Sequence, residues 1–215
     1  METRERIIQA YQHYLREKGR QPATVFKFCQ SLEIGEKDFF ANFSSFDSVE
    51  SAFWEELAGK TADAVTQGPD WAGFGARQRL LSYLFAFLEE SLHYRSLLLV
   101  RVAPLKLKDN PAYLRGLRRR FVEFAEAEIV GPGIESGEIA DRGRINELYA
   151  KSFYLILRGV MNYHLHDEST GFERTDAAAE KSVTFAFDLM RRQALDAAFD
   201  LAKFLKSDRQ TCCCS

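Results

Sequence analysis

Apolar residues recur at spacings of three and four along almost the whole chain, and no segment shows the sustained alternation of a strand. This period places apolar side chains on one face of a helix, so the sequence predicts an all-α fold. Only 5 prolines occur among 215 residues, which leaves room for long helices. Hydrophobic residues make up 46% of the chain, enough to bury the core of one large domain or two small ones.

Three short helices are expected within the first 50 residues. The apolar stripe from Ile7 to Leu15 marks the first helix, which Gly19 ends as a C-cap. Thr24 can cap the second helix, and the third runs from Glu36 to Asn42. A longer helix follows, capped by Ser45 or Asp47 and ending near Ala64.

The Gly/Pro-rich stretch QGPDWAGFG, residues 67–75, is expected to join a small N-terminal module to a larger body. Residues 131–139 are expected to form a loop. We assign residues 1–50 to the N-terminal domain, 51–206 to the body and 207–215 to a flexible tail. The helices expected in the body are 77–94, 95–102, 111–130, 144–166 and 175–205.

The turn between the second and third helices gives a helix-turn-helix pattern, in which the start of the third helix meets base edges in the DNA major groove. The segments RERIIQAYQHYLREKG, ATVFKFCQSLEI and GEKDFFANFSSFDSVE resemble the N-terminal module of the TetR (tetracycline repressor) family of bacterial regulators. The resemblance covers about 50 residues, and the length and helical character of the remaining chain agree with it.

The resemblance implies a homodimeric transcription regulator, such as a repressor, that binds operator DNA and responds to a small, apolar ligand in its body. It implies that the DNA is contacted by the second and third helices and their flanks. The expected DNA-binding residues are Thr24, Lys27, Gly35, Glu36, Lys37, Asp38, Phe39, Asn42 and Ser44.

The charge of this module departs from that of an ordinary DNA reader. Glu33 stands where the family usually has Gly, Glu36 where it usually has Lys, and Asp38 where Thr is common. Residues 1–50 hold seven Lys or Arg and eight acids, although Lys and Arg supply most non-specific DNA affinity. The alternative is therefore a TetR-fold binding protein that has lost DNA binding and carries a hydrophobic ligand or a protein partner.

The segment from Leu80 to Tyr94 is apolar almost all round and is expected to be a central buried helix. The aromatic residues near it form either an ordinary core or the wall of a ligand cavity between helices. The candidate ligand-binding residues are Phe85, His93, Tyr94, Phe124, Tyr154, Arg158 and Met161.

Residues 101–120 carry seven cations against one acid, Asp109. Such a run forms a solvated face that pairs with Glu123, Glu126 and Glu128, or it forms the entrance for an anionic ligand or a contact with nucleic acid or a partner.

The last two helices carry apolar residues on more than one face, which indicates an antiparallel pair that docks on its two-fold mate as a four-helix bundle. The residues concerned are Leu148, Phe153, Leu155, Val160, Val183, Phe187, Met190, Leu195, Phe199, Leu201 and Phe204.

Other function classes find little support. The chain has no Gly-rich phosphate loop, no HExxH motif and no nucleophile elbow, so we expect no enzyme activity and no cofactor. The sequence HLHDE, residues 164–168, is expected to cap a helix rather than bind a metal. No apolar run is long enough for a transmembrane helix. Cys29 and the terminal Cys212–Cys214 show no disulfide or zinc spacing, which favours a reducing cytoplasm.

Overall fold

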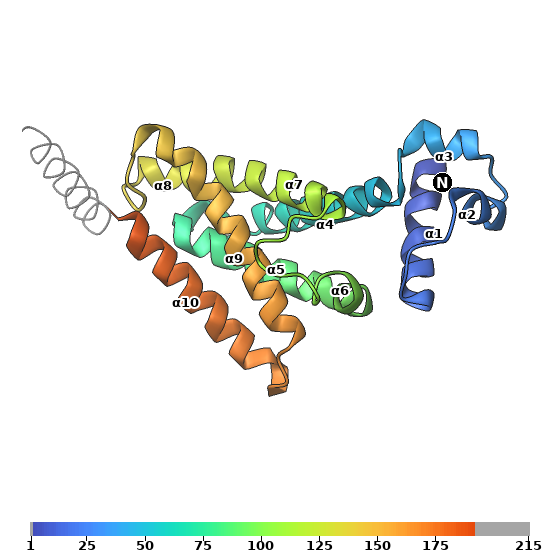
Figure 1. Cartoon of the computed structure of the whole chain (residues 1–215). Coiled ribbons are helices and arrows are strands. Elements are labelled where there is room, and N and C mark those ends of the chain that lie inside the picture. Colours follow the sequence, from blue (N-terminus) through green and yellow to red (C-terminus); the bar gives the residue numbers. More distant parts are fainter. Residues whose placement is uncertain (1, 192–215) are drawn as a thin grey trace, which may run out of the picture.

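The computed structural model describes residues 2–191 and contains helices but no strand in that range. The prediction of an all-α fold is confirmed. Figure 1 shows a small head, made of the first three helices, at one end of an elongated body. The α-helices are α1 (Thr3–Lys18), α2 (Val25–Ser31), α3 (Glu36–Asn42), α4 (Phe46–Thr66), α5 (Ala76–Leu92), α6 (Arg95–Arg101), α7 (Arg115–Ala125), α8 (Gly131–Glu135), α9 (Glu147–Leu165) and α10 (Glu173–Met190).

Aromatic side chains form the centre of the head. Tyr11 of α1 stacks on Phe46 with ring centroids 5.4 Å apart, and Phe28 of α2 meets Phe39 of α3 edge to face at 6.3 Å. Phe39 is fully buried. Because each of the three helices contributes a ring, the cluster fixes their relative orientation.

The helix ends of the head are set by local capping groups, as predicted. Gly19 ends α1 with φ of 64°, a left-handed conformation that glycine adopts without strain. The Thr24 hydroxyl accepts a hydrogen bond from the Lys27 amide at 3.2 Å and starts α2. Ser45 does the same for the Ser48 amide at the start of α4.

Helix α4 joins the head to the body. It starts beside the α3 end and runs through 21 residues, packing against α1 at its beginning and against α5 and α7 farther along. The expected domain boundary after residue 50 therefore falls inside a continuous helix. Residues 67–75 connect α4 to α5 within the body, where Trp71 packs against Phe124 at 5.9 Å, so this segment does not separate head from body.

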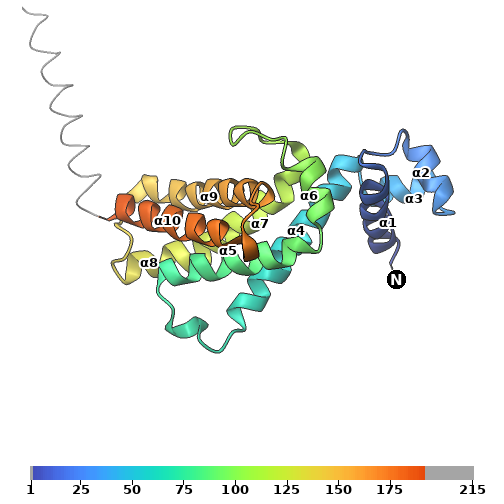
Figure 2. The same cartoon turned by 90° about the horizontal axis from the view of Figure 1, so that it is seen from below.

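The body is built around α5, the central helix that the sequence predicted. Tyr83 of α5 is fully buried, contacts the rings of Phe121 and Phe124, and donates a hydrogen bond to the Ala58 carbonyl at 3.2 Å. On the neighbouring side, α7 approaches α4 so closely that the Gly116 amide bonds the Ser51 hydroxyl at 2.9 Å. Figure 2 shows α9 and α10 side by side across α5.

The expected loop at residues 131–139 is wrong in its first half. The chain continues from α7 through a π-helical stretch, Glu126–Val130, into α8. Pro132 lies in the first turn of α8, directly after the π-helical stretch. Gly133 packs directly against Ala76 and Ile139, so tertiary contact favours a helix that the local sequence does not.

None of the helices within residues 2–191 has the length and hydropathy needed to cross a membrane.

Candidate functional site

Helix α3 begins at Gly35 and is held by its own polar residues. The Asp38 carboxylate accepts a hydrogen bond from the Gly35 amide at 3.1 Å, and the Asn42 side chain donates to the Asp38 carbonyl at 2.8 Å. Glu36 and Lys37 are exposed, and their side chains make no hydrogen bond or ion pair with the described residues. The free groups at the start of α3 are therefore one acid and one cation.

The other candidate DNA-binding residues divide by exposure. Lys27 and Ser44 are exposed, and Thr24 is exposed while capping α2. Phe39 lies in the core of the head, so Phe40, which is 54% exposed, is the aromatic side chain that α3 presents to solvent.

Several charges of the head are held by internal contacts. Arg4 pairs with Glu56 of α4, Arg6 donates to the Leu32 carbonyl at 3.0 Å, and Arg16 donates to the His93 carbonyl at 2.8 Å. Within the described part of the head, the cations whose side chains have no such contact are Arg20, Lys27 and Lys37.

Glu50, one of the eight acids of residues 1–50, lies inside the molecule with 1% of its surface exposed. Its carboxylate accepts from Arg101 Nε at 3.0 and 3.2 Å and from Arg101 Nη2 at 3.0 Å. Tyr11 donates to it at 3.2 Å and Trp54 at 3.3 Å. Burial raises the pKa of Glu50, and the guanidinium acts against that rise. This cluster fixes the start of α4 between the head and α6 of the body.

The cations of residues 101–120 do not pair with the acids that follow them. Within the described residues their ion pairs go to α4 instead: Arg101 to Glu50, Arg119 to Glu55, and Arg120 to Asp63. The expectation of pairing with Glu123, Glu126 and Glu128 is therefore wrong, because α7 packs along α4 and finds its acids there.

The candidate ligand-binding residues do not meet in one cavity. Phe124 and Met161 are packed in the core, and His93 is exposed at the end of α5. Phe85 borders a depression of about 350 Å³ with Phe172 and with His164, whose buried ring nitrogens have no hydrogen-bond partner.

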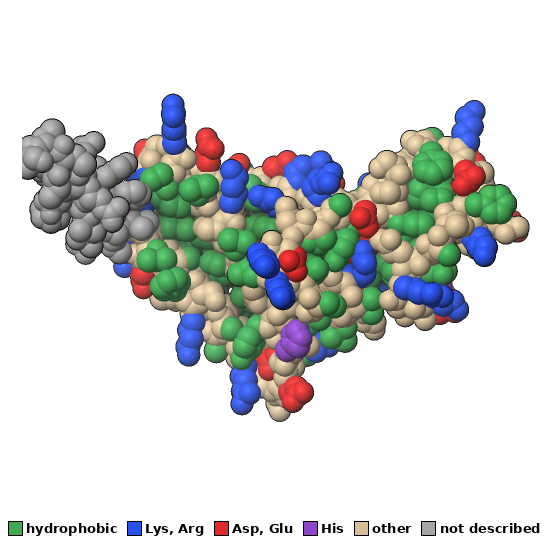
Figure 3. Space-filling model, in the orientation of Figure 1, with side chains coloured by type: hydrophobic (Ala, Val, Ile, Leu, Met, Phe, Trp, Pro, Cys, Tyr) green, Lys and Arg blue, Asp and Glu red, His purple; other side chains and the backbone are tan. Residues whose placement is uncertain are grey.

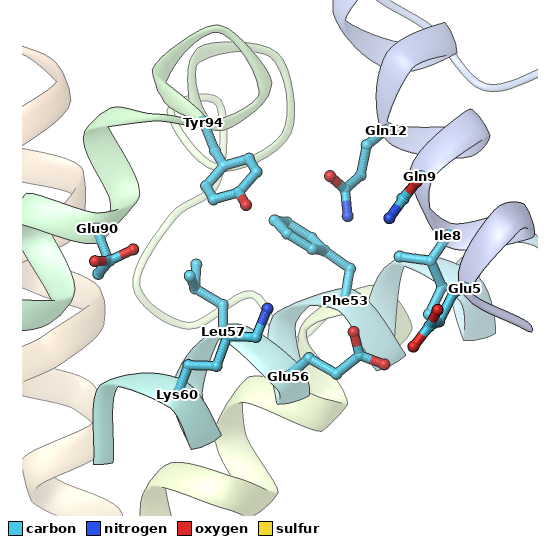
Figure 4. A pocket seen from close by; sticks show the side chains of 10 residues that line it. All are labelled: Glu5, Ile8, Gln9, Gln12, Phe53, Glu56, Leu57, Lys60, Glu90 and Tyr94. Atoms are coloured by element: carbon cyan, nitrogen blue, oxygen red, sulfur yellow. The ribbon is translucent and has the colours of Figure 1, made fainter. Parts of the chain in front are cut away.

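Tyr94 faces a cleft of about 240 Å³ between the head and the body. Figure 4 shows its ring close to Phe53 of α4, with polar side chains of α1 on the opposite wall. Tyr154 and Arg158 border a third pocket, also of about 240 Å³. Three other cations line this pocket. Lys108 and Arg118 belong to the cationic run 101–120, for which an anionic-ligand entrance was one alternative, whereas sequence reasoning missed Lys151. Lys151 could have been found, because it shares one face of α9 with Tyr154 and Arg158 by helical spacing.

The HLHDE segment, residues 164–168, stabilises the connection between α9 and α10. Asp167 accepts hydrogen bonds from the amides and hydroxyls of Ser169 and Thr175 at 2.7 to 2.9 Å. His166 lies 2.8 Å from the Asn162 carbonyl. Among residues 2–191 no group of three or more potential ligands is placed to hold a metal ion.

Comparison with known proteins agrees with this architecture. The sequence profile of the family described as "Tetracyclin repressor-like, C-terminal domain" matches residues 79–205. A comparison with curated proteins gives no significant match.

Three solved structures illustrate the similarity. A regulatory protein in the TetR family from Rhodococcus RHA1 is 18% identical, with 89% of this chain and 98% of that chain covered and a TM-score of 0.52. A TetR-family transcription regulator from Shewanella sp. PV-4 is 12% identical, with 88% and 98% covered and a TM-score of 0.60. Another from Syntrophomonas wolfei is 14% identical, with 87% and 94% covered and a TM-score of 0.56.

At these identities the structural similarity shows the fold, and it includes the head because nearly the whole chain is covered. The profile match covers more than half of the sequence. The chain therefore belongs to the TetR (tetracycline repressor-like) family of transcription regulators.

Proposed function

We propose that the chain is a dimeric, cytoplasmic transcription regulator that binds operator DNA through its head and responds to a small ligand in its body. Family membership supports the regulatory role. The DNA role depends mainly on one observation: α3 sits on a compact three-helix head with its first residues, Glu36 and Lys37, exposed. A helix presented in this way can enter a major groove.

Exposed apolar side chains on α9 and α10 support the dimer. Leu148, Leu155 and Tyr163 follow one face of α9, and Phe185 and Leu189 follow one face of α10. Figure 3 shows hydrophobic side chains over this side of the body. A monomer rarely exposes so many large apolar groups on two adjacent helices, whereas a four-helix bundle between two copies would cover them. The other predicted apolar residues, Phe153, Val160, Val183, Phe187 and Met190, are buried within the subunit, and Leu195, Phe199, Leu201 and Phe204 lie outside the described residues.

A matched pair of variants tests the dimer. Phe185, 65% exposed on α10, and Phe26, 59% exposed in the head, are the same residue type with similar exposure. Phe185→Glu should shift the chain toward monomer in sedimentation equilibrium, since it places a charge in the expected apolar interface. Phe26→Glu should leave the oligomeric state unchanged. A wild-type chain that stays monomeric, or equal effects of the two variants, would contradict this surface.

The alternative function, a binding protein without a DNA role, draws on the acids Glu33, Glu36 and Asp38 around α3 and on the few free cations of the head. Selection from a random duplex library separates the two functions. Enrichment of a duplex sequence supports the regulator, and no enrichment supports the alternative.

Charge variants at Glu36 add a second criterion. Glu36→Lys should raise the affinity for a random duplex several-fold at low salt and steepen its salt dependence, because each head gains a cation at the groove. Glu36→Gln should produce a smaller gain, since it removes the acid without adding a phosphate contact. If fluorescence anisotropy shows no change for either variant, α3 does not approach the phosphates.

A further inference from the structure

The pocket that borders Arg158 lies between α9, α7 and the loop before α7. It has a volume of about 240 Å³, which suits a ligand of few atoms. It combines four cations with a single acid and with apolar side chains. The lining residues are Leu107, Lys108, Asp109, Asn110, Arg118, Lys151, Tyr154, Leu155 and Arg158.

Arg158 is buried without a counter-charge. Only 4% of its surface is exposed, and no carboxylate of the described residues lies within 4.0 Å of its guanidinium. Nη1 donates to the Asp109 carbonyl at 3.3 Å, while Nε is buried without any hydrogen-bond acceptor. A buried cation of this kind is costly unless an anion pairs with it.

Tyr154 precedes Arg158 by one helical turn and is also 4% exposed. Its hydroxyl makes no hydrogen bond of standard geometry with the described residues. Burial raises the pKa of Tyr154, and the nearby Arg158 and Arg118 lower it by less. The hydroxyl therefore stays protonated near neutral pH and is available as a hydrogen-bond donor beside the guanidinium.

The rim strengthens the positive field. Lys108 and Lys151 are exposed at the pocket, and Arg118 is partly exposed. Asp109, the only acid of the lining, accepts a hydrogen bond from the Lys106 amide at 2.8 Å and so stabilises its own loop. A concave site lined by cations concentrates anions from solution. Leu107 gives the same pocket an apolar side, and Leu155, which also borders it, belongs to the apolar face of α9.

We propose that this pocket binds a small organic anion, with carboxylate or phosphate oxygens on Arg158 and the Tyr154 hydroxyl and an apolar portion against Leu107. Both headgroups offer the oxygens that a guanidinium fork and a phenol can bond together. Binding of the anion can be measured without DNA. The further claim that the anion is the effector rests on the proposed regulatory function.

Calorimetric titration of the full-length chain with benzoate, phenyl phosphate and uncharged benzamide tests the site. We expect at least one of the two anions to bind and benzamide to bind at least about tenfold more weakly, because hydrogen bonds to charged groups carry most of the discrimination. Tyr154→Phe should lower the affinity for the anion several-fold. Arg174→Gln, which removes an exposed Arg on α10, should change nothing.

Arg158→Met provides the decisive variant. It should lose at least about tenfold in anion affinity, while its melting temperature in anion-free buffer should equal or exceed that of the wild type, because an unpaired buried charge has been replaced by an apolar chain of similar size. Lys151→Gln keeps the site testable if Arg158→Met fails to fold, and it should weaken binding without affecting melting.

The proposal is overturned if neither anion binds at millimolar concentration, if benzamide binds as well as the tighter of the two anions, or if Arg158→Met and Lys151→Gln both bind like the wild type. These measurements are made without DNA. A failure of duplex selection would therefore reject the proposed function without affecting the proposal that the pocket binds an anion.

Discussion

Replacing Arg101 by Met should destabilise the protein, because it leaves the buried Glu50 carboxylate without a counter-charge. Arg101 supplies three of the contacts to this carboxylate, at 3.0 to 3.2 Å, and the two others come from neutral donors, Tyr11 and Trp54. Removing one partner of a buried ion pair typically costs about 3–5 kcal/mol. Because the Arg101 side chain keeps 19% of its surface exposed, we expect about 3 kcal/mol, the low end of that range.

A double variant separates the buried charge from lost packing. Glu50→Gln in the Arg101→Met background removes the charge, while the amide oxygen can still accept a hydrogen bond from Tyr11 or Trp54. The double variant should therefore be more stable than the single one by about 1–2 kcal/mol. Chemical denaturation at pH 7 measures both, and Arg115→Met, which removes an exposed Arg of α7, should stay within about 0.5 kcal/mol of wild type.

The pH dependence of the destabilisation caused by Arg101→Met provides an independent check on the buried Glu50 charge. Burial already raises the pKa of Glu50 above its unfolded value, and loss of the guanidinium raises it further. A raised carboxyl pKa means that the folded state binds more protons, so stability falls as the pH rises through that pKa. The penalty of Arg101→Met should thus be larger at pH 7 than at pH 5. A penalty under about 1 kcal/mol, or one that grows on acidification, would refute the reasoning.

Three further predictions concern other parts of the chain. Gly116→Ala should cost about 1–3 kcal/mol in urea denaturation, because a Cβ at this position would lie 2.0 Å from the Ser51 carbonyl oxygen and force α7 away from α4. Glu33→Gly should raise stability by about 0.5–1 kcal/mol, since Glu33 has φ of 54°, whereas Glu33→Gln should give no such gain. Burial and the Arg95 charge lower the pKa of His164. Below about pH 6.5 the unfolded histidine therefore binds a proton more readily than the folded one, so the melting temperature of the protein should fall as the pH drops through this range. His164→Gln should flatten that part of the profile.

The head could be predicted from the sequence because its signals are local. Gly19, Thr24 and Ser45 end or start helices through bonds to residues only a few positions away. Glu33 shows the same principle: it occupies the turn position where the family usually has Gly, and its backbone is left-handed.

The candidate sites depend on contacts that the sequence does not reveal. Glu50 and Arg101 are 51 residues apart, so nothing local marks the acid as buried rather than as part of a DNA-facing surface. Arg158 is similar, because an unpaired cation can be recognised only when its surroundings are known. Helix α8 was missed because Gly and Pro usually mark loops, while packing of Gly133 favours the helix.

The central claim, that the head binds DNA, is tested most directly by the salt dependence of affinity for a duplex enriched by selection. Arg20, Lys27 and Lys37 are the free cations of each described head, giving six in a dimer. If all of them meet phosphates, the slope of log affinity against log salt should approach about −5. A clear negative slope that steepens in Glu36→Lys is the predicted result. No enriched duplex, or affinity that does not change with salt, would contradict the account.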